Sequence, residues 1–232
     1  MKDRAFKNKK ELFFNKRAEK LFLFDLPLSF DLWLLRLDNV TFTEREIFYN
    51  ILNEEEKKEV SQFRLEHLRD LFIVRRGLSK MILGNHIRKD PDLITFDKTI
   101  YKKPYLEDYP KVHFNLSHRN WYALLGINEE PIGIDIEDIK EIENFLDLLD
   151  YFASPHEKRW VGSSLKRFFM MWTIKEALMK AQGTGFLIDN IPVLEELPRK
   201  DKNLFFSSSK KYNVYSTFWN NYVISIALER YE

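Results

Sequence analysis

The sequence contains no cysteine, and this absence excludes disulfide bonds, iron–sulfur clusters, thiolate zinc sites and a cysteine nucleophile. It is also typical of a reducing compartment, so we expect a cytoplasmic protein. The chain lacks any uncharged apolar run of about 18 residues, the length of a membrane-spanning helix, so we expect no membrane segment. Neither charge is in excess, because 37 Lys and Arg stand against 36 Asp and Glu, and this balance argues against a general nucleic-acid-binding protein.

The chain does contain enough apolar residues for a large core. Its 232 residues are 44% hydrophobic and include 20 phenylalanines. This length allows one large domain or two halves of about 115 residues. Residues 1–28 are expected to be a basic leader, since the first 20 residues hold eight Lys or Arg and three acidic residues. Asp25, Pro27 and Asp31 interrupt the apolar run that follows, which argues against a signal peptide. The sequence leaves open whether the leader packs onto the rest.

Charge is distributed unevenly along the chain. Residues 64–119 contain 12 Lys or Arg and 7 Asp or Glu, a local net charge of +5. Residues 129–157 contain one basic and 10 acidic residues, a local net charge of −9. The near-balance of charge over the whole chain therefore conceals a basic segment and an acidic segment.

Hydrophobic periodicity predicts helices and strands without regular βαβ units, which indicates an α+β fold. Helices are expected from Asn53 to Gly84-Asn85, over Phe145–Phe152, from Ser154 onward, and over Leu165–Gln182 with Gly183 as its stop. Strands are expected over His113–Ser117, Trp121–Ile127, Ile132–Glu137, Tyr212–Tyr215 and Tyr222–Leu228. The second and third strands are expected to form a hairpin, and the last two an antiparallel pair.

Two carboxylates lie two positions apart on the third strand. Asp135 and Glu137 emerge on one face because strand side chains alternate, while Ile134 and Ile136 point the other way. Paired carboxylates repel and raise each other's pKa unless a cation lies between them, and Mg²⁺ is such a cation. A lone Asp-x-Glu pair, however, is more often an exposed acidic strand edge.

The helix over Leu165–Gln182 contains Glu176 and Lys180, which are i,i+4 neighbours. Most such pairs are solvated ion pairs within one helix. Here Glu176 falls on or beside an apolar stripe that includes Trp172, so its carboxylate needs a partner. A metal shared with the two strand carboxylates would serve.

These two segments together resemble the signatures of the 4′-phosphopantetheinyl transferases, specifically the longer Sfp-type. Residues 132–137 read I-G-I-D-I-E, and the family strand reads V/I-G-V/I-D-x-E. Residues 172–185 read W-T-I-K-E-A-L-M-K-A-Q-G-T-G, and the family helix reads W-S/T-x-K-E-A/S-x-x-K-x-x-G-x-G. Either half alone is a weak signal, but both together, in order and about 40 residues apart, form a specific match.

The resemblance extends upstream, so that it covers about residues 54–195. F-N-L-S-H at 114–118 matches a family segment, and F-A-S-P-H-E at 152–157 resembles another. Y-K-K-P at 101–104 resembles the family's Y-G-K-P, with Lys102 in place of the usual glycine. That departure puts the backbone's approach to adenine in doubt, because glycine is permissive where lysine is not.

The resemblance implies a holo-acyl-carrier-protein synthase type of enzyme. It would move phosphopantetheine from coenzyme A to a serine of an apo acyl or peptidyl carrier protein and release 3′,5′-ADP. Asp135, Glu137 and Glu176 would hold Mg²⁺ or Mn²⁺ against the coenzyme A pyrophosphate. Glu176, or a water that it orients, would be the base for the carrier serine, and Lys180 would contact pyrophosphate oxygens.

Other residues of the matched segments are implied to bind the nucleotide end of coenzyme A. Ser117 and His118 would lie near the 3′-phosphate. Lys103 and Pro104 would line the adenine end, with Lys103 near phosphate.

Basic residues of the first long helix are implied in the same task. Arg76 and Arg69 are candidates either for the 3′-phosphate or for helix packing, and the sequence does not decide which of these two and Lys80 makes the contact. Glu157 is expected to support the fold or start a helix rather than bind the metal. Lys175 precedes Glu176 directly, so it points away from the helix face that carries Glu176 and Lys180. Its role could be in binding or in the structure.

The family also implies an architecture of two similar α+β halves related by pseudo-twofold symmetry. On this chain the halves would be residues 29–128 and 129–232, meeting near 128–131, with coenzyme A between them. Shorter relatives trimerise, so a chain of this length is expected to be a monomer. Its partners would be coenzyme A and the carrier protein, with no nucleic acid and no membrane.

Two alternatives stay open at this point. One is a metal-dependent phosphohydrolase, which also uses spaced acids and a lysine. The other is a catalytically inactive carrier-protein-binding module of the same fold. The sequence identifies neither the carrier protein and its pathway nor the choice between Mg²⁺ and Mn²⁺.

Overall fold

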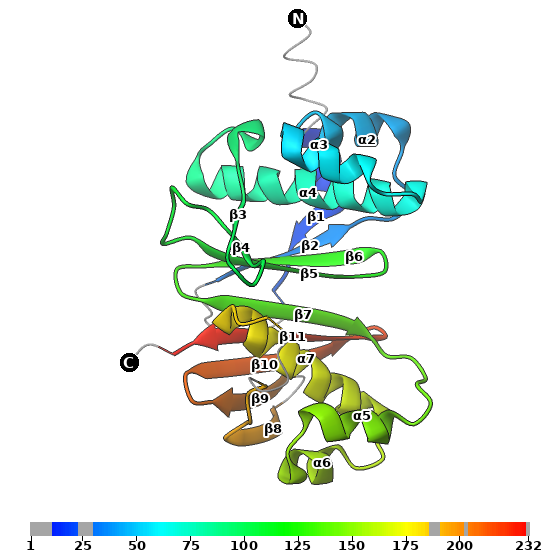
Figure 1. The fold of residues 1–232 in the computed structure, drawn as a ribbon, viewed down its shortest axis with the longest axis vertical. Coiled ribbons are helices and arrows are strands. Elements are labelled where there is room, and N and C mark those ends of the chain that lie inside the picture. Colours follow the sequence, from blue (N-terminus) through cyan, green and yellow to red (C-terminus); the bar gives the residue numbers. More distant parts are fainter. Residues whose placement is uncertain (1–10, 23–29, 186–190, 202–203, 231–232) are drawn as a thin grey trace, which may run out of the picture. The chain divides into compact units, whose positions relative to one another are not determined.

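The computed structural model describes residues 11–22, 30–185, 191–201 and 204–230, in which helices and strands are mixed (Figure 1). The α+β class expected from the sequence is confirmed. Internal packing divides the described residues into two compact units. Unit 1 comprises residues 11–21, 33–96 and 120–123, and unit 2 comprises residues 22, 30–32, 97–119, 124–185, 191–201 and 204–230. None of the described helices is long and apolar enough to cross a membrane.

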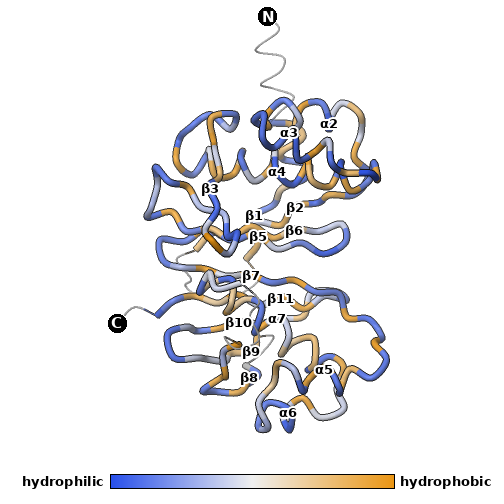
Figure 2. Tube along the Cα trace, in the orientation of Figure 1, coloured by the Kyte–Doolittle hydropathy of each residue, from blue (hydrophilic) through white to orange (hydrophobic). Residues whose placement is uncertain are grey.

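Unit 1 is organised around one long helix. Its elements include β1 (Ala18–Lys20), β2 (Asp31–Arg36), α2 (Phe42–Tyr49), α3 (Glu54–Ser61), α4 (Glu66–Ile87) and the 3-10 helix η1 (Pro91–Leu93). β1 pairs antiparallel with β2, and α4 packs against α2, α3 and η1. Hydrophilic and hydrophobic residues are mixed along α4, whereas α3 is almost entirely hydrophilic (Figure 2). The predicted stop at Gly84 is wrong by one turn, because α4 ends only where Arg88 takes a left-handed φ of +57°.

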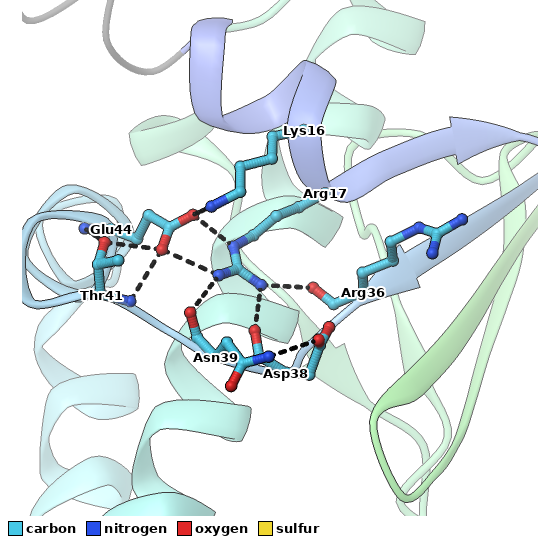
Figure 3. A network of polar contacts seen from close by, with 7 residues as sticks. All are labelled: Lys16, Arg17, Arg36, Asp38, Asn39, Thr41 and Glu44. Carbon is cyan, nitrogen blue, oxygen red and sulfur yellow. Dashed lines mark hydrogen bonds and ion pairs between the residues drawn. The ribbon is translucent and has the colours of Figure 1, made fainter.

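Part of the basic leader is built into unit 1. Residues 11–17 are helical, and the side chain of Arg17 is 3% exposed. Its guanidinium donates to both carboxylate oxygens of Glu44, at 2.7 and 2.9 Å. It also donates to the carbonyl oxygens of Arg36, Asp38 and Asn39 (Figure 3). The question that the sequence left open is therefore answered for residues 11–20, which form a helix and a strand paired with β2, while residues 1–10 and 23–28 lie outside the described residues.

Unit 2 is a five-stranded antiparallel sheet covered by helices. Its elements are β3 (Asp97–Lys98), β4 (Pro104–Tyr105), β5 (His113–Arg119), β7 (Ile132–Asp138), α5 (Phe145–Phe152), α6 (Pro155–Val161), α7 (Leu165–Gln182), β8 (Glu196–Asp201), β9 (Leu204–Ser209), β10 (Tyr212–Trp219) and β11 (Tyr222–Glu229). The sheet order is β7-β11-β10-β9-β8. α7 packs across β7 and β11, and an apolar core fills the space between them. α5, α7 and the pairing of β10 with β11 are as predicted, and α7 ends at Gly183 with φ of +71°.

The expected hairpin between the second and third predicted strands is wrong. β6 (Tyr122–Asn128) lies next to β5 in another sheet, whereas β7 pairs with β11 and sets Asp135 opposite Ser225. Both strands are buried over most of their length. Strands buried on both faces read as continuous apolar runs, and such runs carry no alternation that identifies a partner.

One order of elements occurs twice along the chain, namely a strand, two short helices, a long helix and later two consecutive strands. The first copy is β2, α2, α3, α4, β5 and β6, and the second is β7, α5, α6, α7, β10 and β11. In each copy a buried glutamate in the first turn of the second short helix pairs with a buried lysine of the long helix. Glu56 lies 2.8 Å from Lys80, and Glu157 lies 2.5 Å from Lys175. The two similar halves expected from the sequence are thus present as a repeated order of elements.

Candidate active site

The central strand of the site is β7, on which Asp135 and Glu137 share one face. Asp135 is buried and Glu137 is half-buried, while Ile134 and Ile136 occupy the alternate positions. Gly133 lies on the carboxylate face. A Cβ atom at this glycine would lie 2.0 Å from the carbonyl oxygen of Ala177 in α7, so only glycine permits the helix backbone to approach so closely. The glycine of the strand motif is therefore what brings α7 against the carboxylates.

This approach sets Lys180 and Glu176 beside Asp135. The Lys180 ammonium lies 2.6 Å from Asp135 Oδ1 and 4.0 Å from Glu176 Oε2. One side of α7 is half-buried, and it carries Trp172, Glu176 and Lys180. Most other residues of the helix are buried. Glu176 therefore lies beside apolar side chains, as predicted, since Trp172 packs against the apolar core and Met179 is buried. Its own side chain is half-buried.

Strand β5 joins the same group from a third element. Asn115 Oδ1 accepts a hydrogen bond from the Ile134 backbone N–H at 2.8 Å, which ties β5 to β7. The buried Ser117 hydroxyl donates to Asp135 Oδ1 at 2.9 Å, and the Lys180 ammonium donates to the Ser117 hydroxyl at 3.2 Å. Residues 115 and 117 of the F-N-L-S-H segment thus meet residues of both later signatures. His118, the next residue of that segment, is exposed and occupies the alternate position of β5.

Glu176 and Lys180 also line a pocket of about 270 Å³. The lining residues are Tyr101, Lys102, Lys103, Pro104, Asn115, Leu116, Glu176, Met179, Lys180, Gly183 and Gly185. Lys103 and Pro104, which were predicted to line the adenine end of a ligand, therefore share one pocket with the predicted catalytic residues. The Lys103 ammonium donates to the carbonyl oxygen of Ala181 at 3.0 Å, and burial lowers the pKa of Lys103 to about 8.

The electrostatics around Asp135 fit a divalent cation. Asp135 Oδ2 is buried and has no hydrogen-bond partner among the described residues. Burial, followed by the charge of Asp135, raises the pKa of Glu137 to about 6. Burial also raises the pKa of Glu176, against the opposing charge of Lys180. A hard cation would give the bare oxygen of Asp135 a partner, and it would favour the ionised forms of Glu137 and Glu176.

The three predicted metal ligands, Asp135, Glu137 and Glu176, do not surround a common metal position in the described structure. In the part of the chain that the structure describes, no group of three or more His, Cys, Asp or Glu side chains is arranged as a metal site. Lysine and arginine side chains instead contact the carboxylates of Asp135 and Glu137. The metal set of Asp135, Glu137 and Glu176 therefore stays a prediction.

Comparison with known proteins gives this geometry a family. The model described as "4′-phosphopantetheinyl transferase superfamily" matches residues 131–227, and the one described as "4′-phosphopantetheinyl transferase, N-terminal" matches residues 40–130. The 4′-phosphopantetheinyl transferase HetI of Nostoc sp. is 31% identical over 175 residues, which are 72% of this chain and 71% of HetI. The chain belongs to the 4′-phosphopantetheinyl transferase superfamily.

Two further 4′-phosphopantetheinyl transferases of this superfamily are similar over a shorter stretch. Gsp of Aneurinibacillus migulanus is 30% identical over 154 residues, 62% of this chain and 63% of gsp. Sfp of Bacillus subtilis is 27% identical over 147 residues, 61% of this chain and 65% of Sfp. The matched segment thus spans a little under two thirds of each of these relatives. The Sfp-type resemblance expected from the sequence is confirmed.

The three basic residues that were considered for the 3′-phosphate, Arg69, Arg76 and Lys80, lie on α4 in unit 1. Arg76 lies over the Phe96 ring at 4.8 Å and 3.5 Å from Glu56, contacts that support helix packing. Arg69 lines a separate pocket of about 410 Å³, and its Nε has no hydrogen-bond partner among the described residues. Lys80 is fully buried and donates to Glu56, so of the three it is the least available to a ligand.

Glu157 and Lys175, whose roles the sequence left open or only expected to be structural, both make structural contacts. Glu157 accepts the backbone N–H of Ser154 at 2.7 Å and closes a capping box at the start of α6, as expected of a helix-start residue. Lys175 is buried against Glu157 and donates to the carbonyl oxygen of Pro192, which points it away from Asp135 and leaves it in a packing role.

Arg119 is a site residue that the sequence reasoning missed. Its guanidinium lies 3.2 Å from Glu137 Oε2 and also contacts Asp138. The signal was present, because Arg119 stands two residues after Ser117 on the same strand and shares its face. The family segment that the sequence resembles ends at His118, so the resemblance implies no role for Arg119.

Proposed function

We propose that the chain is a Mg²⁺-dependent transferase that moves 4′-phosphopantetheine from coenzyme A to a serine of an apo acyl or peptidyl carrier protein and releases 3′,5′-ADP. The observation that carries the proposal lies in unit 2. There Ser117, Asp135 and Lys180 form one hydrogen-bonded group beside a pocket that Glu176 lines. Membership of the superfamily supports the same activity.

The carboxylates of Asp135, Glu137 and Glu176 would hold Mg²⁺ or Mn²⁺, since both ions prefer carboxylate and water oxygens. When bound, the ion would supply positive charge to the pyrophosphate oxygens of coenzyme A. The bare Oδ2 of Asp135 supports its place in this set.

Glu176 is half-buried and lines the pocket. We propose this carboxylate, or a water that it orients, as the base. It takes the proton of the carrier serine, whose oxygen forms a bond to the phosphorus that carries the pantetheine. The bond from that phosphorus to the bridging oxygen of coenzyme A breaks, and 3′,5′-ADP leaves with the electron pair. The Lys180 ammonium stabilises the charge on this leaving phosphate.

We propose that the nucleotide part of coenzyme A binds through Lys103, Pro104, Ser117 and His118. The shared pocket of Lys103, Pro104 and Glu176 supports this arrangement. Arg76 and Arg69 are proposed only as candidates for the 3′-phosphate.

The test mixes the protein with coenzyme A, Mg²⁺ and an apo carrier protein and weighs the carrier by mass spectrometry. A gain of one phosphopantetheine with release of 3′,5′-ADP supports the proposal. Cleavage of coenzyme A without a gain by any of several carriers would indicate a phosphohydrolase. Carrier binding without either reaction would indicate an inactive module.

The same assay tests the residues. Asp135→Ala and Glu176→Ala are expected to abolish the gain while the circular dichroism spectrum stays native. Glu143→Ala, which removes an exposed acid of unit 2, is the matched control and is expected to keep the activity. Full activity of either site variant would contradict the roles assigned here.

We further propose a monomeric, cytoplasmic enzyme whose halves are residues 29–128 and 129–232. The absence of cysteine supports the compartment. The boundary of the two family matches at 130 and 131 supports the division along the chain.

A further inference from the structure

Lys102 holds a backbone conformation that lysine rarely adopts. Its φ is +63°, in the left-handed region. Among the described residues six non-glycine residues have positive φ, and four of them are asparagines, which tolerate this region. The fifth, Arg88, ends α4. Lys102 is the sixth, and it stands where the family motif has glycine.

The strain at Lys102 is imposed by the loop between β3 and β4. The Lys102 N–H donates to the carbonyl oxygen of Thr99 at 2.8 Å, and the Thr99 N–H donates to the carbonyl oxygen of Lys103 at 2.9 Å. These bonds keep the turn that a glycine would make without cost. Such strain tends to persist where a side chain has a function.

The side chain of Lys102 is exposed and lines the pocket of Glu176 and Lys180. The other two lysines of this pocket are engaged, because Lys180 pairs with Asp135 and Lys103 donates to a backbone carbonyl. Within the described residues, the Lys102 ammonium has neither an ion pair nor a hydrogen bond. An anion that enters the pocket can therefore meet Lys102 without breaking an existing contact.

We propose that Lys102 is a ligand-binding residue of this chain that contacts a phosphate group of the donor nucleotide. The inference rests on the proposed function, since it takes coenzyme A as the occupant of the pocket. Lys102 adds a positive charge that the glycine of the family motif cannot supply. The cost is a strained, left-handed backbone at this residue.

The test measures coenzyme A binding by isothermal titration calorimetry for wild type and three variants. Lys102→Asn removes the charge but tolerates the left-handed backbone, Lys102→Gly removes both charge and strain, and Lys102→Arg keeps the charge. We expect the dissociation constant to rise about fivefold to tenfold for the first two and to stay within about twofold for the third. Lys98→Asn, an exposed lysine of the same hairpin that lines neither pocket of this region, is the matched control and should bind as wild type does.

Two further arms sharpen the result. With dephospho-coenzyme A, which lacks the 3′-phosphate, a persisting difference between wild type and Lys102→Asn assigns the contact to the pyrophosphate, and a vanished difference assigns it to the 3′-phosphate. The melting temperature of Lys102→Gly should equal or exceed that of wild type, because the strain is relieved, so that weaker binding cannot be ascribed to unfolding.

The outcomes separate the two proposals. If the Lys102→Asn and Lys102→Gly proteins bind coenzyme A as wild type does, the role of Lys102 is overturned, whatever the transfer assay gives. Wild type that binds coenzyme A but transfers nothing overturns the proposed activity alone. Wild type that does not bind coenzyme A overturns both.

Discussion

The Lys180 ammonium lies 2.6 Å from Oδ1 of Asp135, although the two residues are 45 positions apart. The Ser117 hydroxyl donates to the same oxygen, while Oδ2 has no partner among the described residues. One oxygen of this buried carboxylate is thus held by donors from α7 and β5, and the other is left bare. The arrangement orients the carboxylate and keeps one oxygen available to a cation.

The close approach of α7 to β7 should depend on Gly133. In Gly133→Ala the new Cβ would meet backbone atoms of Ala177 and Ala181 at 2.0 and 2.3 Å, so the helix must move away from Asp135. We expect a loss of unfolding free energy of about 3 kcal/mol and the loss of transfer activity. Urea denaturation and the transfer assay measure the two effects.

Gly126→Ala is the control for this change. Its Cβ would come closest to the terminal Cδ1 atoms of Ile134 and Ile132, which are side-chain atoms that can shift more easily than the helix backbone. It should therefore cost less stability than Gly133→Ala and keep the activity. Equal losses in both variants would refute the importance of the helix approach.

Two lysines on α7, five residues apart, should have different phenotypes. Lys175→Ala leaves the buried Glu157 carboxylate without its cation, so we expect a loss of about 3–5 kcal/mol of unfolding free energy. Lys180→Ala also takes the cation from a buried carboxylate, but Asp135 keeps the hydrogen bond from Ser117, so we expect a smaller loss of stability together with a loss of about 100-fold or more in kcat. A Lys175→Ala protein with native stability, or a Lys180→Ala protein with normal kcat, would reverse these assignments.

The Arg17–Glu44 pair should tie the leader to unit 1. Arg17→Ala leaves the fully buried Glu44 carboxylate with the longer contact to the exposed Lys16 ammonium, at 3.4 Å, and with the hydrogen bonds from Thr41, and we expect a loss of about 3 kcal/mol in urea denaturation at pH 7. Arg36→Ala breaks a pair with Glu19 in which both partners are about half exposed, and it should cost less than about 1 kcal/mol. Similar costs for the two variants would mean that the leader contributes little.

Glu44 also predicts a pH dependence of stability. Burial alone would raise the pKa of Glu44, but hydrogen bonds from Arg17 and Thr41 outweigh it and lower the pKa to about 2. The ionised, paired carboxylate therefore stabilises the fold fully above pH 4.5, and this contribution is lost as the pH falls from 4.5 towards 2. Denaturation at pH 7, 4 and 3 should show the loss in wild type but a weaker one in Glu44→Gln, and parallel curves would contradict it.

Lys103 predicts a pH dependence of ligand binding. Its pKa is lowered to about 8 by burial, so the ammonium that we propose to contact phosphate is lost as the pH rises through 8. The affinity for 3′,5′-ADP should fall above pH 8, by up to about tenfold per pH unit. Titrations between pH 7 and 9.5, where phosphate monoesters are already doubly charged, isolate this effect. Lys103→Arg, which stays charged, should show no such fall, and a fall of equal size would sink the assignment.

Local features of the chain were predictable. The spacing of apolar residues and the glycine after it predicted α7 with both of its ends, and alternation on a strand put Asp135 and Glu137 on one face. The start of α6 followed from Ser154 and Glu157. In each case the interactions that decide the structure lie within a few residues, so the sequence pattern contains them.

The tertiary structure alone decided which distant groups meet. β7 pairs with β11 rather than with the neighbouring β6, Arg119 contacts Glu137, and Lys180 reaches Ser117, 63 positions away. These contacts depend on how helices and strands that are distant in the sequence pack together. A local sequence pattern does not contain this information. The sequence by itself therefore determined the class of fold, through its hydrophobic periodicity, and the family, through its two signatures, while the absence of cysteine excluded thiol chemistry. Only the fold determined, among the described residues, which oxygen of Asp135 is bare and which lysine of the pocket has no partner.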